Sequence, residues 1–245
     1  MRPLGASSRA ILASSITRPS THCDAKCRCC RYVERVDTFA EIAAERRLLA
    51  DLVEDLSAEQ EATQSLCGAW TVHDVTAHLL MPLVTPMPKV VLAMVRNGMN
   101  FDRANVALTA GVAKLSSAEI AEALRSRADH RFTPPGLGPE APLTDIVVHG
   151  QDIRRPLGLT REIPEQRQRA VLDFMAGGSS KAVVPTARKV GLRLEATDLG
   201  WSAGEGALVS GQAEALMMAL AGRPVALAEL TGDGIPILSE RLAAS

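Results

Sequence analysis

The sequence predicts a mainly α-helical protein, a bundle of helices followed by a small α/β unit, and three observations carry this prediction. Aromatic residues make up only 3% of a chain that is 47% hydrophobic, so the core must be built from Ala, Leu, Val and Ile, which suit packed helices. From Val36 onward, apolar residues recur at helical spacing. Near the C-terminus the pattern changes to the alternation that is typical of a strand.

Capping boxes mark the expected helix starts. Thr38-x-x-Glu41 opens the first helix, Ser57-x-x-Gln60 a short element, Thr71-x-x-Asp74 the next helix, and Ser116-x-x-Glu119 a later one. Pro82 should end or kink the helix that starts at Thr71. The expected helices cover residues 38–56, 71–82, 89–96, 102–114, 116–131 and 142–155, with a proline-rich loop at 132–142.

The tail has a different character. A further amphipathic helix is expected over 164–177, followed by a hinge at 177–180. Residues 191–197 alternate as a strand, 206–210 form a second candidate strand, and helices are expected over 211–222 and 236–242. We therefore expect a bundle domain over 36–180 and a small α/β domain over 181–245, docked on the bundle because about 60 residues bury little surface alone.

Residues 1–35 differ from the rest of the chain. They are rich in Arg, Ser and Thr, and no acidic residue precedes Asp24. We expect a disordered N-terminal extension, or else a mis-assigned start with the native chain beginning near Val36. Sequencing the N-terminus of the native protein distinguishes the two, because recovery of Met1 excludes the second.

Cysteine usage indicates a reducing compartment, and hence a cytoplasmic protein. Four of the five cysteines lie together at Cys23, Cys27, Cys29 and Cys30, whereas a secreted disulfide scaffold spreads its cysteines through the fold. Their C-x₃-C-x-C-C spacing is a poor match to a zinc site. Cys67 stands apart and is interpreted as a small buried hydrophobic residue.

Charge and hydropathy exclude several partners. The 27 basic and 28 acidic residues give a net charge of -1, which offers no electrostatic attraction for nucleic acid or an anionic membrane. The most apolar stretch, Leu83–Val95, is interrupted by Pro86, Pro88 and Lys89, so no run reaches the ~18–20 residues of a membrane span. We expect neither nucleic-acid nor membrane binding, and a monomer or homodimer.

One group of residues has the pattern of a metal site. Asp145 and His149 lie four residues apart on one expected helix and so share a face, and His78 lies in an apolar stretch of another helix. Two imidazoles and a carboxylate leave open positions on a divalent ion. Asp152 and Asp74 are placed to bind the second nitrogens of the two histidines. Spacing alone leaves open a core histidine and a surface Asp–His pair.

Two segments resemble the signatures of the mycothiol-dependent maleylpyruvate isomerase family. Residues 66–79 (LCGAWTVHDVTAHL) are similar to the first signature, in which Trp-Thr/Ser-x-x-Asp-Val leads to a His-Leu pair. Residues 143–158 (LTDIVVHGQDIRRPLG) are similar to the second, in which a carboxylate lies four residues before a histidine. The resemblance runs from about Val36 to the C-terminus. It implies a DinB-like four-helix bundle and a small α/β C-terminal domain of the sterol-carrier type.

Carried over to this chain, the resemblance implies His78, Asp145 and His149 as ligands of a divalent metal, commonly zinc. The characterised isomerase has Glu where this chain has the shorter Asp145. The resemblance also implicates an arginine of the C-terminal domain in catalysis, for which Arg223 is the nearest match. A substrate carboxylate would bind Arg223, Arg154 or Arg155. The alternatives are that Arg223 caps the C-terminus of the helix before it and that Arg154 and Arg155 form a solvated helix end.

The implied activity is that of a metal- and thiol-dependent isomerase or S-transferase. Mycothiol or a similar low-molecular-weight thiol would be held as a thiolate on the metal and add to a small electrophilic substrate. Loss of the thiol after bond rotation gives an isomerase, and retention of the adduct gives a transferase. The alternative is a non-catalytic metal- or ligand-binding or regulatory protein of the same fold.

Overall fold

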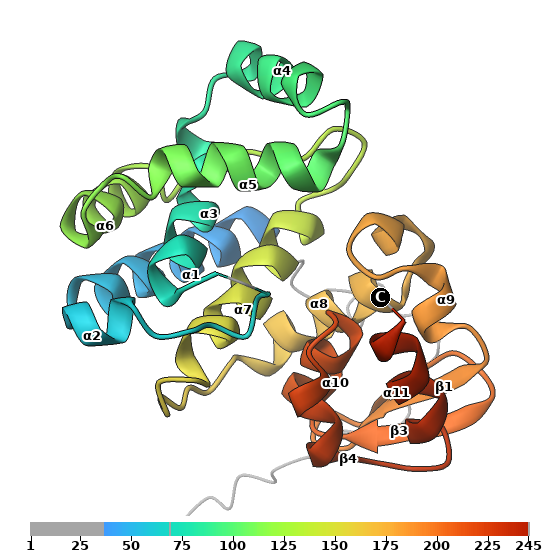
Figure 1. The fold of residues 1–245 in the computed structure, drawn as a ribbon. Coiled ribbons are helices and arrows are strands. Elements are labelled where there is room, and N and C mark those ends of the chain that lie inside the picture. Colours follow the sequence, from blue (N-terminus) through green and yellow to red (C-terminus); the bar gives the residue numbers. More distant parts are fainter. Residues whose placement is uncertain (1–36, 69, 245) are drawn as a thin grey trace, which may run out of the picture. The chain divides into compact units, whose positions relative to one another are not determined.

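Helices account for most of the chain that the computed structural model describes, residues 37–68 and 70–244 (Figure 1). A small sheet lies near the C-terminus, so the predicted fold class is confirmed. The predictions for residues 1–35, including the four clustered cysteines, lie outside the described residues. Within the described ranges, no helix combines the length and the apolar character that crossing a bilayer requires.

The N-terminal part is a bundle. Its long helices are α1 (Thr38–Glu54), α3 (Val72–Val84), α5 (Phe101–Val112), α6 (Ser117–Ser126) and α7 (Glu140–Arg154). Helix α1 packs on α6 and α7, and α3 packs on α5, α6 and α7, so that one apolar core forms among them. The shorter helices are α2 (Ala58–Glu61) and α4 (Met87–Arg96), and α4 packs on α5.

Three of the four predicted capping boxes are present. The side chains of Ser57, Thr71 and Ser116 each accept a hydrogen bond from the backbone N–H three residues on. The acid or amide side chain at that third position accepts one from the backbone N–H of the capping residue. The box predicted at Thr38 is wrong. Asp37 is the N-cap of α1, because its carboxylate accepts a hydrogen bond from the backbone N–H of Phe39 (3.0 Å).

Two predicted helix ends also move. Pro82 lies in the last turn of α3, and the helix continues for two residues to Val84. Helix α6 ends at Ser126, five residues before the predicted end at Arg131, where Arg127 leaves the helical conformation.

The C-terminal part is a mixed sheet with helices. It contains β1 (Leu192–Ala196), β2 (Trp201–Ala203), β3 (Ala207–Gly211) and β4 (Leu230–Thr231) in the order β2-β1-β3-β4. Strands β1 and β3 are parallel, and the edge strands pair antiparallel. The helical elements are α8 (Glu165–Ala176), η2 (Gly178–Ala182), α9 (Thr186–Lys189), α10 (Ala213–Leu220), η3 (Pro224–Glu229) and α11 (Ile235–Ala243).

The predicted hinge at residues 177–180 is wrong. This segment runs into the 3₁₀ helix η2, and Ser180 is fully buried. The Ser180 hydroxyl donates to the carbonyls of Met175 (2.9 Å) and Gly177 (2.8 Å), and the Lys189 ammonium donates to the same two carbonyls. Such a network fixes the backbone rather than freeing it.

A second apolar core joins α7 to the sheet. It includes Val147 and Val148 of α7, Leu172 of α8, Val209 of β3 and Leu216 of α10. The same helix α7 therefore faces the bundle core through Ile146 and Ile153 and the C-terminal core through its valines. This places the predicted site residues of α7 between the two cores.

Candidate functional site

Three predicted site residues meet between α3 and α7. His78 lies in the middle of α3, and Asp145 and His149 lie one turn apart on α7. One carboxylate oxygen of Asp145 lies 3.7 Å from His78 Nε2 and 3.5 Å from His149 Nε2. The two imidazole rings meet edge to face, with 4.9 Å between their centroids. The structure therefore brings together His78 of α3 with Asp145 and His149 of α7.

The spacing of these atoms suits a single metal ion. Each residue offers one ligand atom, and the three lie within 4.8 Å of one another. Tetrahedral ligands about 2.1 Å from zinc lie about 3.4 Å apart, close to the two separations measured here. Two imidazoles and a carboxylate are also a donor set that first-row divalent ions accept. The residues fit such an ion, and the shorter Asp145 reaches both histidines.

Asp152 orients His149. The Nδ1 atom of His149 donates to Asp152 Oδ2 at 2.8 Å, and the Asp152 side chain is fully buried. This bond turns the other nitrogen, Nε2, toward Asp145 and His78. Asp152 thus occupies the position predicted from its spacing.

His78 is held differently. Its Nδ1 is buried and has no hydrogen-bond partner among the described residues. Asp74, the predicted partner, instead accepts hydrogen bonds from the backbone and hydroxyl of Thr71 (3.0 and 2.8 Å), because its capping role takes the carboxylate. The ring of Trp70 lies 4.9 Å from the His78 ring and tilted by 40°, so Trp70 covers this histidine.

The carboxylates give the site a strong charge. Burial opposes ionisation of Asp145, but the hydrogen bond and charge of His78, with the charges of His149 and Arg223, outweigh it and lower the pKa of Asp145 to about 2. Burial likewise disfavours a charged His149, but hydrogen bonds to Asp152 and Cys67 and the nearby carboxylates raise the pKa of His149 to about 10. The buried carboxylates of Asp145 and Asp152 thus favour a positive charge at His149.

Arg223 completes a chain of contacts behind His149. It follows Gly222, whose positive φ of 95° is a conformation that favours glycine. Arg223 Nε donates to Asp152 Oδ1 at 2.9 Å, and Nη2 donates to Asp152 Oδ2. The C-terminal arginine implied by the resemblance therefore binds the carboxylate that orients His149.

Sequence reasoning missed Cys67 as part of this site. Its thiol, the His149 ring and the Asp152 carboxylate offer three ligand atoms within 4.8 Å of one another. The side chain is half-buried and packs against the bundle core, so the interpretation as a buried hydrophobic residue holds only in part. The sequence signal that could have pointed to Cys67 is its position in residues 66–79, the same signature segment that contains His78.

Two predicted carboxylate binders are occupied elsewhere. Arg154 is buried and donates to the carbonyl of Gly150 (3.1 Å). Arg155 donates to Glu214 (2.8 Å) and Glu229 (2.6 Å) of the C-terminal part. Both arginines are therefore engaged within the fold.

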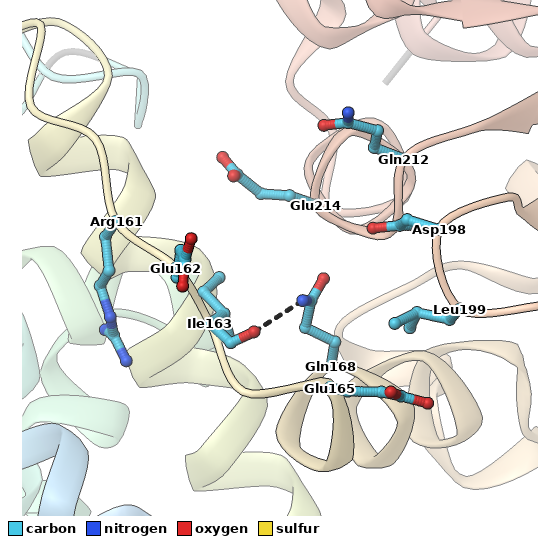
Figure 2. Close-up of a pocket in the computed structure, with 9 residues that line it drawn as sticks. All are labelled: Arg161, Glu162, Ile163, Glu165, Gln168, Asp198, Leu199, Gln212 and Glu214. Atoms are coloured by element: carbon cyan, nitrogen blue, oxygen red, sulfur yellow. Dashed lines mark hydrogen bonds between the residues drawn. The ribbon is translucent and has the colours of Figure 1, made fainter.

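A cavity of about 360 Å³ lies away from this cluster (Figure 2). Its lining carries four carboxylates, and Figure 2 shows the Arg161 guanidinium turned away from the other lining residues. The guanidinium donates to the Glu45 carboxylate. The lining residues are Arg161, Glu162, Ile163, Glu165, Gln168, Asp198, Leu199, Gln212 and Glu214. None of them belongs to the His78–Asp145–His149 cluster.

Known proteins resemble this chain in sequence and in fold. Residues 42–133 match the family model described as the mycothiol maleylpyruvate isomerase N-terminal domain. A crystal structure of the mycothiol-dependent maleylpyruvate isomerase is 14% identical with a TM-score of 0.52, over 80% of this chain and 91% of that one. A mutant of that isomerase gives a TM-score of 0.49 at the same identity and coverage. No curated protein matches the chain by sequence. At 14% identity the structural likeness establishes the fold.

Proposed function

We propose that this protein, whose residues 42–133 match the mycothiol maleylpyruvate isomerase N-terminal domain, is a metal- and thiol-dependent isomerase or S-transferase. Its metal ligands would be His78, Asp145 and His149, its metal zinc, and its cosubstrate mycothiol or a similar low-molecular-weight thiol. One observation carries the proposal, namely that both histidine Nε2 atoms lie 3.5–3.7 Å from the same Asp145 oxygen.

The bound ion would supply Lewis acidity, which keeps a thiol deprotonated at neutral pH. The residues of the chain prepare that site. Asp152 holds the His149 ring through Nδ1, and Arg223 holds Asp152 in turn. Arg223 is thus a positioning residue that acts through Asp152. Trp70 covers one face of His78 and shields that side of the cluster from water.

The first experiment measures metal content. Purified wild-type protein is expected to hold one equivalent of zinc by elemental analysis, and His78→Ala and His149→Ala are expected to lose it. His73→Ala is the matched control, because His73 Nε2 lies 3.0 Å from the carbonyl of Ala113, outside the cluster. Full metal content in both site variants would refute the proposed ligands.

The second experiment tests the chemistry. The zinc-loaded protein is mixed with mycothiol and a model electrophile in a single turnover. Formation of the thioether adduct supports an S-transferase, and rearrangement of the electrophile with recovery of the thiol supports an isomerase. One observation favours a second candidate, a non-catalytic binding or regulatory protein: Arg154, Arg155 and Arg223 are all engaged within the protein. A zinc-loaded protein that does neither reaction would be a non-catalytic binding or regulatory member of this fold.

A further inference from the structure

Helix α4 is unusually apolar for a helix on the surface. Only two of the ten residues in Met87–Arg96 are charged, and none is buried. Figure 1 shows α4 at the edge of the bundle, above α5, on which it packs. An apolar helix face that no other described element covers marks a surface for contact with a partner.

The exposed side of α4 carries a continuous apolar stripe. Met87, Val91 and Val95 follow one another at intervals of four residues and are 56%, 57% and 63% exposed. At about 100° per residue, Lys89 and Arg96 lie roughly 150° around the helix from the middle of this stripe. The stripe therefore contains no charge of its own.

The turn after α4 extends the apolar surface. Met99 is the only non-glycine residue with a positive φ (60°) in the described ranges, and its N–H donates to the carbonyl of Met94 at 2.8 Å. Glycine or asparagine would adopt this conformation at lower cost. The strained backbone instead directs a methionine outward, 66% exposed, and Phe101 at the start of α5 is 69% exposed.

We infer that this surface is the interface of a homodimer. We define the α4 face as Met87, Val91, Leu92, Val95, Met99 and Phe101, all of them exposed. Each of the six is between 46% and 69% exposed, whereas apolar side chains on the surface of a monomer are normally exposed singly.

A second copy of the chain is the occupant that this surface favours. A two-fold interface places a patch against itself, and an uncharged stripe meets its copy without like-charge repulsion. A membrane is the weaker match, because an interfacial helix uses its cations beside the apolar face, near the lipid phosphates. Here Lys89 and Arg96 lie roughly 150° around α4 from the middle of the stripe, and they approach the α4 face only at Leu92, about 40–60° away.

Sedimentation velocity of the full-length protein tests the inference. Wild type is expected to be a dimer at micromolar concentration, and the double variant Val91→Glu/Val95→Glu to raise the dimer Kd on the order of 100-fold, because four carboxylates enter the interface. The control is Leu48→Glu on α1, an apolar residue of comparable exposure (45%), which should leave the dimer unchanged. Melting temperatures report whether each variant is folded.

A cross-linking variant keeps the test decisive if the double variant does not fold. Val91→Cys lies at the middle of the stripe and, in a protein whose five native cysteines are replaced by serine, is expected to form a disulfide-linked dimer on mild oxidation, whereas the same protein without Val91→Cys cannot. A monomeric wild type, a double variant that dimerises as wild type does, or no cross-link through Val91→Cys would overturn the inference. A monomer that floats with anionic vesicles would overturn it in favour of membrane binding.

Discussion

Replacing Asp152 with asparagine removes one negative charge from the centre of the site and leaves its shape almost unchanged. The Asp152 carboxylate is fully buried and accepts from His149 Nδ1 (2.8 Å) and from Arg223 Nε (2.9 Å) and Nη2. An amide has one acceptor oxygen and two donor hydrogens, so Asp152→Asn cannot satisfy both partners. Breaking a buried ion pair by removing one partner costs about 3–5 kcal/mol, and loss of the group that orients a ligand histidine lowers metal affinity by about 10–100-fold.

Two assays separate these effects. Urea denaturation of the metal-free protein measures the free energy of unfolding, and competition with a chromophoric chelator measures zinc affinity. Asp173→Asn is the matched control, because the Asp173 carboxylate accepts from Trp201 Nε1 (2.7 Å) outside the cluster, so its loss should lower stability and leave zinc affinity unchanged. If Asp152→Asn binds zinc within about threefold of wild type, orientation of His149 through Asp152 is refuted.

Three further outcomes are expected. Because the pKa of His149 is raised to about 10, zinc binding at pH 7 should release a proton and become tighter as the pH rises toward 10; calorimetry in two buffers of different ionisation enthalpy measures the release, and equal observed heats in the two buffers would contradict it. Asp145→Glu, which restores the longer carboxylate that the resemblance implies, should keep zinc in elemental analysis, whereas Asp145→Ala should lose it; full zinc in the alanine variant would exclude Asp145 as a ligand. Arg223→Gln should lower the free energy of unfolding by about 2–4 kcal/mol, since it leaves the Asp152 charge buried with His149 alone; an unchanged urea midpoint would show that the pair contributes nothing.

Local signals in the sequence predicted the helices well because a capping box involves only four residues. The boxes at Ser57, Thr71 and Ser116 form as expected, whereas Asp37 replaced Thr38 because both are good N-caps and only the backbone path decides between them. Strands β2 and β4 were missed because three and two residues are too few to show a period.

The site was predictable where a single helix holds its members. Asp145, His149 and Asp152 share one face of α7, so spacing alone related them. The contact between Asp152 and Arg223 joins residues 71 positions apart, and no periodicity reports such a contact. The partners of Arg155 were hidden in the same way, because Glu214 and Glu229 reach it only after the sheet has folded.

The apolar core that runs from α7 through α8 to the sheet has a consequence for modular engineering. Val147, Leu172 and Leu216 belong to one packed cluster, so a chain cut before β1 would expose to water the faces of α7 and α8 that the sheet and α10 now cover. The C-terminal segment is therefore not a cassette that can be exchanged for that of another protein. A graft would have to match the shape of these valine and leucine side chains before α7 could again present Asp145 and His149 at their present separation.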